Sequence, residues 1–342
     1  MPYAFFLKPL AISFIAASIL LIAAVLFNRK KTFSETRSSS RHIHIPGTSR
    51  FGGVAIILSF LIALIFDGRL VLDSPLIGIF FASILILLFG VFDDIRQLSW
   101  QTQLMLQVIA VLPVFLFGIH LQYVSNPFGG VFLLSGSFLN VLGFVLAFLW
   151  IMLLMNAMNW VDGVDGVSGG ISLIASVAIF ILSQRPEVNQ PPIGIICMAL
   201  IGTLAAFLLF NLHPSKILAG SSGAMFMGFI LAILAFFAGA KIATTLLVMS
   251  VPIIDALWVI WRRWRDKVSI FSADRRHLHF SLLELGWSEF AIALLYWGLT
   301  ALIAVVALST KAQGKIVAFT LVLLLMTSFL YFVKRRIDKS KL

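Results

Sequence analysis

The sequence predicts an all-α polytopic membrane protein, and both its composition and its long apolar runs support that class. Of its 342 residues, 61% are hydrophobic and only 11% are charged, and the mean hydropathy is +1.06. Ordinary soluble domains carry about 25% charged residues, so a soluble fold could not cover this much apolar surface. We expect one integral membrane domain over residues 1–342.

The apolar runs predict about eleven transmembrane helices, because crossing a bilayer takes roughly 20 apolar residues. The first run is followed by Asn28-Arg29-Lys30-Lys31, a stop-transfer pattern, and is therefore expected to be retained rather than cleaved. The predicted spans are 5–27, 51–66, 74–92, 101–119, 137–156, 167–183, 193–210, 222–239, 242–261, 288–308 and 315–333.

The basic residues predict the orientation of these spans. If loop 28–50 lies in the cytoplasm and the spans alternate, 19 of the 25 lysines and arginines fall on the cytoplasmic side. This asymmetry follows the positive-inside rule, which places the N-terminus outside and the C-terminus in the cytoplasm.

The net charge of +11 is explained by this topology and by contact with anionic lipid headgroups, so nucleic acid is not an expected partner. The single cysteine, Cys197, lies in an apolar run and excludes an intrachain disulfide or a thiolate metal site.

Unusual polar residues gather in five predicted cytoplasmic loops. Because these loops share one side of the membrane, we expect them to form one site whose ligand arrives from the cytoplasm. The loops are 28–50, 93–100, 156–166, 211–222 and 262–287.

Asp93 and Asp94 end an apolar span, where burying an ionised carboxylate costs free energy and therefore indicates a function. Paired carboxylates suit Mg²⁺, which prefers oxygen ligands and substrate phosphates, and one of them could act as a base. The alternative is an ordinary interfacial loop in which one aspartate caps the next helix.

The segment from Asn156 to Gly170 is more specific. Asn156, Asn159 and Asp162 recur every three residues and would share one helix face, and two Asp-Gly steps, at Asp162 and Asp165, allow close backbone approach to a ligand. Their oxygens suit a metal, a nucleobase or ribose hydroxyls, and the alternative is a turn with helix capping.

Two further loops carry cations. Asn211 and Lys216 precede Gly220-Ser221-Ser222-Gly223, a helix start suited to phosphate; the alternative is a plain loop. The last loop contains Arg275-Arg276-His277-Leu278-His279, and its two arginines suit the binding of phosphate. The alternative is a basic loop that is simply exposed to solvent. Asp255, inside an apolar span, is expected to face a cavity or a partner rather than lipid.

Together these motifs resemble the polyprenyl-phosphate N-acetylhexosamine-1-phosphate transferase family. Asn156 to Gly166 resembles the family's Asn-x-x-Asn-x-x-Asp-Gly-x-Asp-Gly segment, and Asp93-Asp94 resembles its paired aspartates. The other resembling segments are His44 with Arg50-Phe51-Gly52-Gly53, Phe210 to Pro214 with Gly220 to Gly223, and Asp274 to His279.

The resemblance implies transfer of N-acetylhexosamine 1-phosphate, most simply N-acetylglucosamine 1-phosphate, from a UDP-sugar to undecaprenyl phosphate in the inner membrane. UMP leaves, and the product starts a cell-envelope glycan such as lipopolysaccharide or teichoic acid. Mg²⁺ or Mn²⁺ is the implied cofactor. The implied partners are the two substrates and the lipid bilayer, and a homodimer is allowed.

The resemblance also assigns roles to residues. Asp93 would activate the lipid phosphate, Asp94 and Asn159 would join it at the metal, and Asp162 and Asp165 would hold uridine or metal. The implied substrate contacts further include His44, Asn156, Asn211, Lys216, Arg275, Arg276, His277 and His279.

This chain departs from the family pattern at three positions. Ser221 stands where the family has an aspartate that resembles a metal ligand, Gln97 where a third acid is common, and Phe280 where some members carry a histidine. Ser221 supports one alternative, an impaired relative that only binds substrate. Two further alternatives are a phospho-N-acetylmuramoyl-pentapeptide transferase and a transporter.

Overall fold

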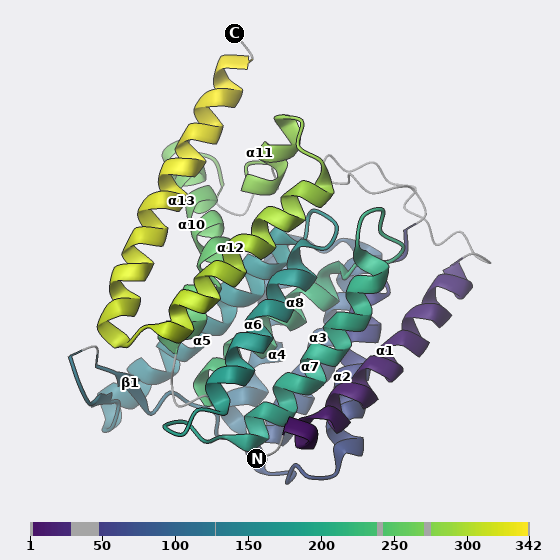
Figure 1. Ribbon diagram of the computed structural model, residues 1–342, viewed down its shortest axis with the longest axis vertical. Helices are drawn as coiled ribbons and strands as arrows, with labels where there is room; N and C mark the ends of the chain where they lie inside the picture. The colour runs from purple at the N-terminus through teal and green to yellow at the C-terminus, as the bar shows by residue number, and fades with distance from the viewer. Residues whose placement is uncertain (1–2, 29–47, 127, 238–241, 270–274, 341–342) are drawn as a thin grey trace.

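The computed structural model describes residues 3–28, 48–126, 128–237, 242–269 and 275–340. These form a bundle of roughly aligned helices with the N-terminus at one end and the C-terminus at the other (Figure 1). Thirteen α-helices, one 3-10 helix and one short hairpin are present in these ranges. The all-helical prediction is thus confirmed apart from the hairpin.

The helices follow the predicted apolar runs closely. In chain order they are η1 (Tyr3–Phe6), α1 (Leu7–Asn28), α2 (Gly52–Asp67), α3 (Ser74–Arg96), α4 (Trp100–Leu116), α5 (Ser137–Val161), α6 (Val167–Ser183), α7 (Pro191–Asn211), α8 (Gly220–Phe237), α9 (Ile242–Val248), α10 (Ser250–Arg265), α11 (Leu278–Glu284), α12 (Glu289–Ser309) and α13 (Ala312–Ser340). Strands β1 (Tyr123–Ser125) and β2 (Val131–Leu133) pair antiparallel between α4 and α5, where no element was predicted.

Seven of the described helices are long and apolar enough to cross a membrane. Helices α9 and α10 make an eighth candidate if they count as one span, although they meet at an angle of 72°. Helices α2, α4 and α6 are apolar but shorter, so a multi-pass membrane protein is confirmed while the count of eleven spans stays a prediction.

Burial follows position in the bundle. Helices α7 and α8 are the most buried of the long helices, whereas α1 and α13 are the least buried and lie at its margins (Figure 1). Close packing at the centre depends on glycine: a Cβ added to Gly90 of α3 would lie 2.3 Å from the Cα atom of Ser222 in α8. The two backbones therefore touch there, and this contact sets the ends of both helices side by side.

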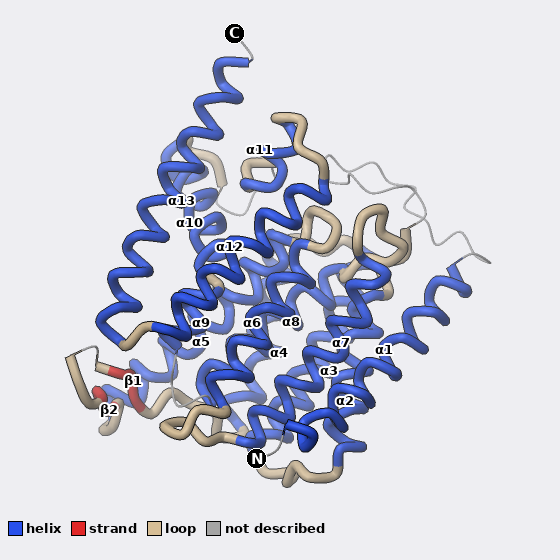
Figure 2. Tube along the Cα trace, viewed as in Figure 1, coloured by secondary structure: helices blue, strands red, loops and turns tan. Residues whose placement is uncertain are grey.

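The predicted loops 93–100 and 156–166 are shorter in the structure because the helices before them extend further than expected. Helix α3 continues to Arg96 and α5 to Val161, so Asp93, Asp94, Asn156 and Asn159 lie on final helical turns. The remaining connections at this end of the bundle, together with α11, gather in the upper part of Figure 2.

Candidate active site

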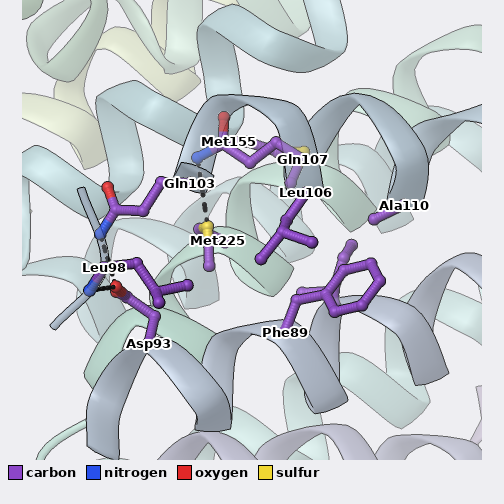
Figure 3. A pocket seen from close by; sticks show the side chains of 10 residues that line it. Phe89, Asp93, Leu98, Gln103, Leu106, Gln107, Ala110, Met155 and Met225 are labelled. Carbon is purple, nitrogen blue, oxygen red and sulfur yellow. Dashed lines mark hydrogen bonds between the residues drawn. The ribbon is translucent and has the colours of Figure 1, made fainter. Parts of the chain in front are cut away.

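Asp93 lies in the last turn of α3 and lines a pocket with mostly apolar walls. Its carboxylate oxygen Oδ1 accepts hydrogen bonds from the backbone N–H of Leu98, at 2.9 Å, and from Gln103 Nε2, at 2.8 Å (Figure 3). Its oxygen Oδ2 accepts no hydrogen bond within the described part of the chain. The pocket is also lined by Leu98, between α3 and α4, and by residues of α3, α4, α5 and α8, namely Ile86, Phe89, Gln103, Leu106, Gln107, Ala110, Met155 and Met225.

Asn156 contributes to the same region through Gln107. The two side-chain amides form a reciprocal pair, in which Asn156 Nδ2 donates to Gln107 Oε1 at 2.8 Å and Gln107 Nε2 donates to Asn156 Oδ1 at 3.3 Å. Gln107 also lies 3.3 Å from the sulfur of Met225 (Figure 3). Asn156, predicted to bind substrate, is therefore engaged in joining α4 to α5.

Asp94, the next residue, faces a different helix. Its carboxylate accepts hydrogen bonds from the backbone N–H groups of Ser221, at 2.7 Å, and Ser222, at 3.3 Å, and from the Ser222 hydroxyl, at 3.1 Å. These are the first residues of α8, whose unpaired N–H groups and positive end favour a carboxylate. Arg50 is also close enough to attract Asp94 electrostatically.

The segment before α2 is tied to the same place. The backbone N–H of Leu218 donates to the carbonyl of Ser49 at 2.8 Å, and that of Gly52 donates to the carbonyl of Leu218 at 3.1 Å. This parallel bridge brings the predicted loop 28–50 to the start of α8. His44 lies outside the described residues, so its predicted role is untested.

The connection between α5 and α6 holds the two Asp-Gly steps. Asp162 accepts a short hydrogen bond from the Ser168 hydroxyl. Asp165 is buried, and its Oδ2 accepts from the backbone N–H of Ser215 at 3.0 Å. The side chain of Asn159 is half-buried and forms no hydrogen bond to a described residue, so its amide is available to a ligand.

Asn211 joins this connection to the one between α7 and α8. Its Oδ1 accepts from the backbone N–H of Gly166 at 3.0 Å, and its Nδ2 donates to the carbonyl of Ile217 at 2.9 Å. Both ends of this buried amide are used, so Asn211 links the two connections, and its predicted contact with a substrate stays a prediction. Lys216, by contrast, is exposed and stays a candidate for substrate binding.

His213 and Glu289 belong to the site although they were not among the predicted site residues. His213 Nδ1 lies 3.2 Å from Asp165 Oδ2 and 3.6 Å from Glu289 Oε2. The ligand atoms of these three residues lie within 4.8 Å of one another, which is compatible with a cation or with a protonated histidine between two carboxylates. In the sequence, only two features point to these residues: His213 lies in the motif around Asn211, and Glu289 is an acidic residue at the start of an apolar helix.

The predicted substrate-binding residues of the last loop include both exposed and buried side chains. Arg275 is exposed with its guanidinium 5.9 Å from the Phe280 ring, and Arg276 Nη1 donates to Asp266 at 2.7 Å. His277 is buried against Asp255, as expected for an aspartate that faces a partner.

His279 is fully buried, which prevents direct contact with a substrate in this conformation. A Cβ added to Gly163 would lie 2.5 Å from His279 Nε2 and 2.9 Å from Cζ of Phe280. Burial lowers the pKa of His279 to about 3, so the ring is neutral near pH 7. We interpret His279 as packing against the Asp-Gly connection.

The residues expected to bind Mg²⁺ fit it in chemistry but only partly in arrangement. Carboxylate and amide oxygens are the ligands that Mg²⁺ prefers. Asp93 keeps one oxygen without a hydrogen bond in the described ranges, and the Asn159 amide is likewise available. Asp94 instead accepts three hydrogen bonds at the start of α8, so fewer of its lone pairs are open to a metal.

Comparison with known proteins identifies the family of this chain. The family model for glycosyl transferase family 4 matches residues 76–239, which include Asp93, Asp94 and the Asp-Gly segment. A probable undecaprenyl-phosphate N-acetylglucosaminyl 1-phosphate transferase of Bacillus subtilis is 26% identical over 260 residues, covering 73% of this chain and 70% of the relative.

Two other relatives extend the match. A decaprenyl-phosphate N-acetylglucosaminephosphotransferase of Mycolicibacterium smegmatis is 30% identical, covering 79% of this chain and 73% of the relative. A phospho-N-acetylmuramoyl-pentapeptide-transferase of Staphylococcus epidermidis is 25% identical, covering 84% of this chain and 92% of the relative. The chain therefore belongs to glycosyl transferase family 4 and is a sugar-phosphate transferase of the membrane.

Proposed function

We propose that this protein transfers N-acetylglucosamine 1-phosphate from UDP-N-acetylglucosamine to undecaprenyl phosphate. An oxygen of the lipid phosphate bonds to the β-phosphorus of the nucleotide sugar, the bond from that phosphorus to the bridging oxygen breaks, and UMP leaves. The lipid-linked sugar diphosphate then begins a cell-envelope glycan. The names of the Bacillus and mycobacterial relatives support this choice of sugar and lipid carrier.

One observation carries the proposal: a buried carboxylate lies at an apolar pocket near the end of a membrane helix. Asp93 is 5% exposed, is held by Leu98 and Gln103, and shares its pocket with Phe89, Leu106 and other apolar residues (Figure 3). A lipid that carries a phosphate needs this combination of an apolar wall and a polar end. Asp93 would orient the lipid phosphate and accept its proton where one is present.

Mg²⁺ or Mn²⁺, when bound, would neutralise charge on the diphosphate, as in other phosphoryl transfers. Asp93 and Asn159 would hold it, with substrate oxygens completing the ligand set. Asp162 and the connection around Asp165 would hold the uridine part, while Lys216, Arg275 and Arg276 would bind phosphate or sugar.

The positive-inside pattern supports a site that faces the cytoplasm in the inner membrane, where nucleotide sugars are available. A second candidate is transfer of phospho-N-acetylmuramoyl-pentapeptide, which is supported by the Staphylococcus relative. A third is a binding protein without activity, which is supported by Ser221.

The test is transfer of labelled sugar phosphate from UDP-N-acetylglucosamine to undecaprenyl phosphate by the purified protein with Mg²⁺. The Ser221→Asp variant and UDP-N-acetylmuramoyl-pentapeptide as donor are run in parallel. We expect transfer of N-acetylglucosamine phosphate by the unmodified chain and loss of transfer when EDTA removes the metal.

Each other outcome points elsewhere. Activity only after Ser221→Asp would mean that the natural chain is disabled at its metal site, and activity only with the pentapeptide donor would establish the second candidate. Silence of both proteins with both donors would overturn the proposal.

A further inference from the structure

Asp255 is a buried carboxylate that the proposed reaction does not use. It lies in α10, inside the apolar run 242–261, and is 1% exposed. An ionised aspartate in such surroundings is costly unless its oxygens are hydrogen-bonded. Something in the structure must therefore compensate for its burial.

Both compensating donors come from one short stretch at the end of the last loop. Asp255 Oδ2 lies 2.8 Å from His277 Nδ1, and Oδ1 accepts from the backbone N–H of Leu278 at 2.9 Å. Because an ionised carboxylate only accepts hydrogen bonds, the proton of this pair belongs to Nδ1 of the imidazole. The donors lie 22 and 23 residues from Asp255 along the chain, so the pair ties the start of α11 to α10.

Arg275 and Arg276 directly precede His277, so the anchor also fixes where this pair of arginines lies. Arg276 is held by Asp266, which directly follows α10, and Arg275 is exposed next to the anchored residues. The His277 ring centroid lies 5.9 Å from that of Trp160, the residue after Asn159, and its ring is nearly parallel to that of His279 at 5.7 Å. The anchor thus joins α10, α11 and the end of α5.

We propose that Asp255 is a positioning residue that anchors the Arg275–Arg276 turn through His277, so that this turn faces the phosphates of the nucleotide sugar. His277 is only 4% exposed, which suits an anchor better than the direct substrate contact predicted from the sequence. The inference rests on the proposed function, because it assigns the arginine turn to that substrate.

The sharpest test compares two substitutions of His277 that each keep half of its chemistry. Asparagine places an N–H near the position of Nδ1 and can still donate to Asp255, whereas glutamine extends to the position of Nε2 and loses that donor. We expect His277→Asn to keep kcat/KM within about threefold of the unmodified protein. His277→Gln and Asp255→Ala should lower it roughly 10- to 100-fold, as loss of an orienting partner does, mainly by raising KM for the nucleotide sugar.

Asp67→Asn provides the matched control, because Asp67 is also 1% exposed and both its carboxylate oxygens accept hydrogen bonds, but it lies in α2 at the opposite end of the bundle. It should leave KM for the nucleotide sugar unchanged within about threefold. The opposite order, with glutamine active and asparagine inactive, would show that Nε2 acts on the substrate and would overturn the proposal. Equal loss or equal retention in the two His277 variants would overturn it as well.

A second measurement does not require transferase activity. Trypsin cleaves after arginine, so the rate of cleavage at Arg275 and Arg276 in detergent reports how firmly the turn is held. We expect faster cleavage in Asp255→Ala and His277→Gln than in His277→Asn or Asp67→Asn. Unchanged cleavage in all variants would overturn the anchor, whereas faster cleavage in a protein without transfer activity would keep the anchor and reject only the proposed function.

Discussion

The two ends of the helix bundle solve the burial of carboxylates in different ways. Near the N-terminus, Asp67 at the end of α2 forms a two-pronged ion pair with Arg69, two residues away, and the backbone carbonyl of Asp67 accepts from Lys8. The hydrogen bond that Arg69 donates to Asp67 raises the pKa of Arg69 further, so this cation is permanent. Here the charge of the carboxylate is neutralised within its own segment.

At the opposite end, Asp93 receives neutral hydrogen-bond donors instead, whereas Asp94 receives neutral donors and is also attracted by Arg50. Asp93 accepts from a backbone N–H and a glutamine, and Asp94 accepts from two backbone N–H groups and a hydroxyl. Neutral donors stabilise a carboxylate without cancelling its charge. The comparison teaches that Asp67 has a cation in its own segment, whereas Asp93 is held by neutral donors and keeps its charge for a metal or a substrate.

The largest expected effect comes from exchanging one carboxylate at each end for its amide. Asp93→Asn should lower kcat/KM for transfer by about 10²- to 10⁴-fold, the range for loss of a general base, while Asp67→Asn should change it by less than about threefold. Steady-state kinetics of the two purified variants check this. Similar losses in both, or more than a tenth of the activity in Asp93→Asn, would remove the distinction between the two ends.

The next largest expected effect is a loss of stability when a side chain is added at Gly163, which is tightly packed. An added Cβ would press on His279 and Phe280, so Gly163→Ala should cost about 1–3 kcal/mol of stability, as overpacking does. Gly298→Ala is the matched control, since a Cβ there meets nothing within 4 Å and alanine favours a helix. Thermal unfolding in detergent measures both, and an equal midpoint in the two variants would contradict the assigned packing.

Asp94 should behave as a helix cap when it is compared with its neighbour. Asp94→Ala removes the acceptor at the start of α8 and should cost about 1 kcal/mol, while Asp94→Asn keeps an acceptor and should cost less. Thermal unfolding separates the two variants. If Asp94→Asn instead abolishes transfer as fully as Asp93→Asn does, Asp94 has the catalytic or metal role implied by its family resemblance.

The smallest effect near neutral pH concerns His279. Its folded pKa of about 3 lies below the ordinary value of 6.5, so the unfolded chain binds a proton that the folded chain does not as pH falls through this range. This stability is fully present above pH 6.5 and is lost toward pH 3, by up to about tenfold in the folding equilibrium per pH unit.

A titration of thermal midpoints from pH 7.5 to pH 5 tests that effect. The midpoint of the unmodified protein should fall more steeply than that of His279→Leu, which cannot bind the proton. Parallel curves would show that His279 is accessible to water in the folded protein.

The motifs alone were enough to predict the membrane class, the order of the helices and the family. Apolar runs determine where helices form because each helix satisfies its own backbone hydrogen bonds in lipid, whatever surrounds it. The segment around Asn159 and the pair Asp93-Asp94 were likewise found as motifs, since their residue types and spacing are visible in the chain itself.

Only the tertiary structure decided what those side chains contact. Adjacent residues on a helix point about 100° apart, so Asp93 and Asp94 reach different neighbours, α4 and α8, that no local pattern names. For the same reason the contacts of Asn211 with Gly166, of His279 with Gly163 and of His213 with Glu289 join distant segments that the sequence does not pair. Local sequence determines the helices and the chemistry they carry, but the direction in which a polar group faces depends on which helices pack beside it.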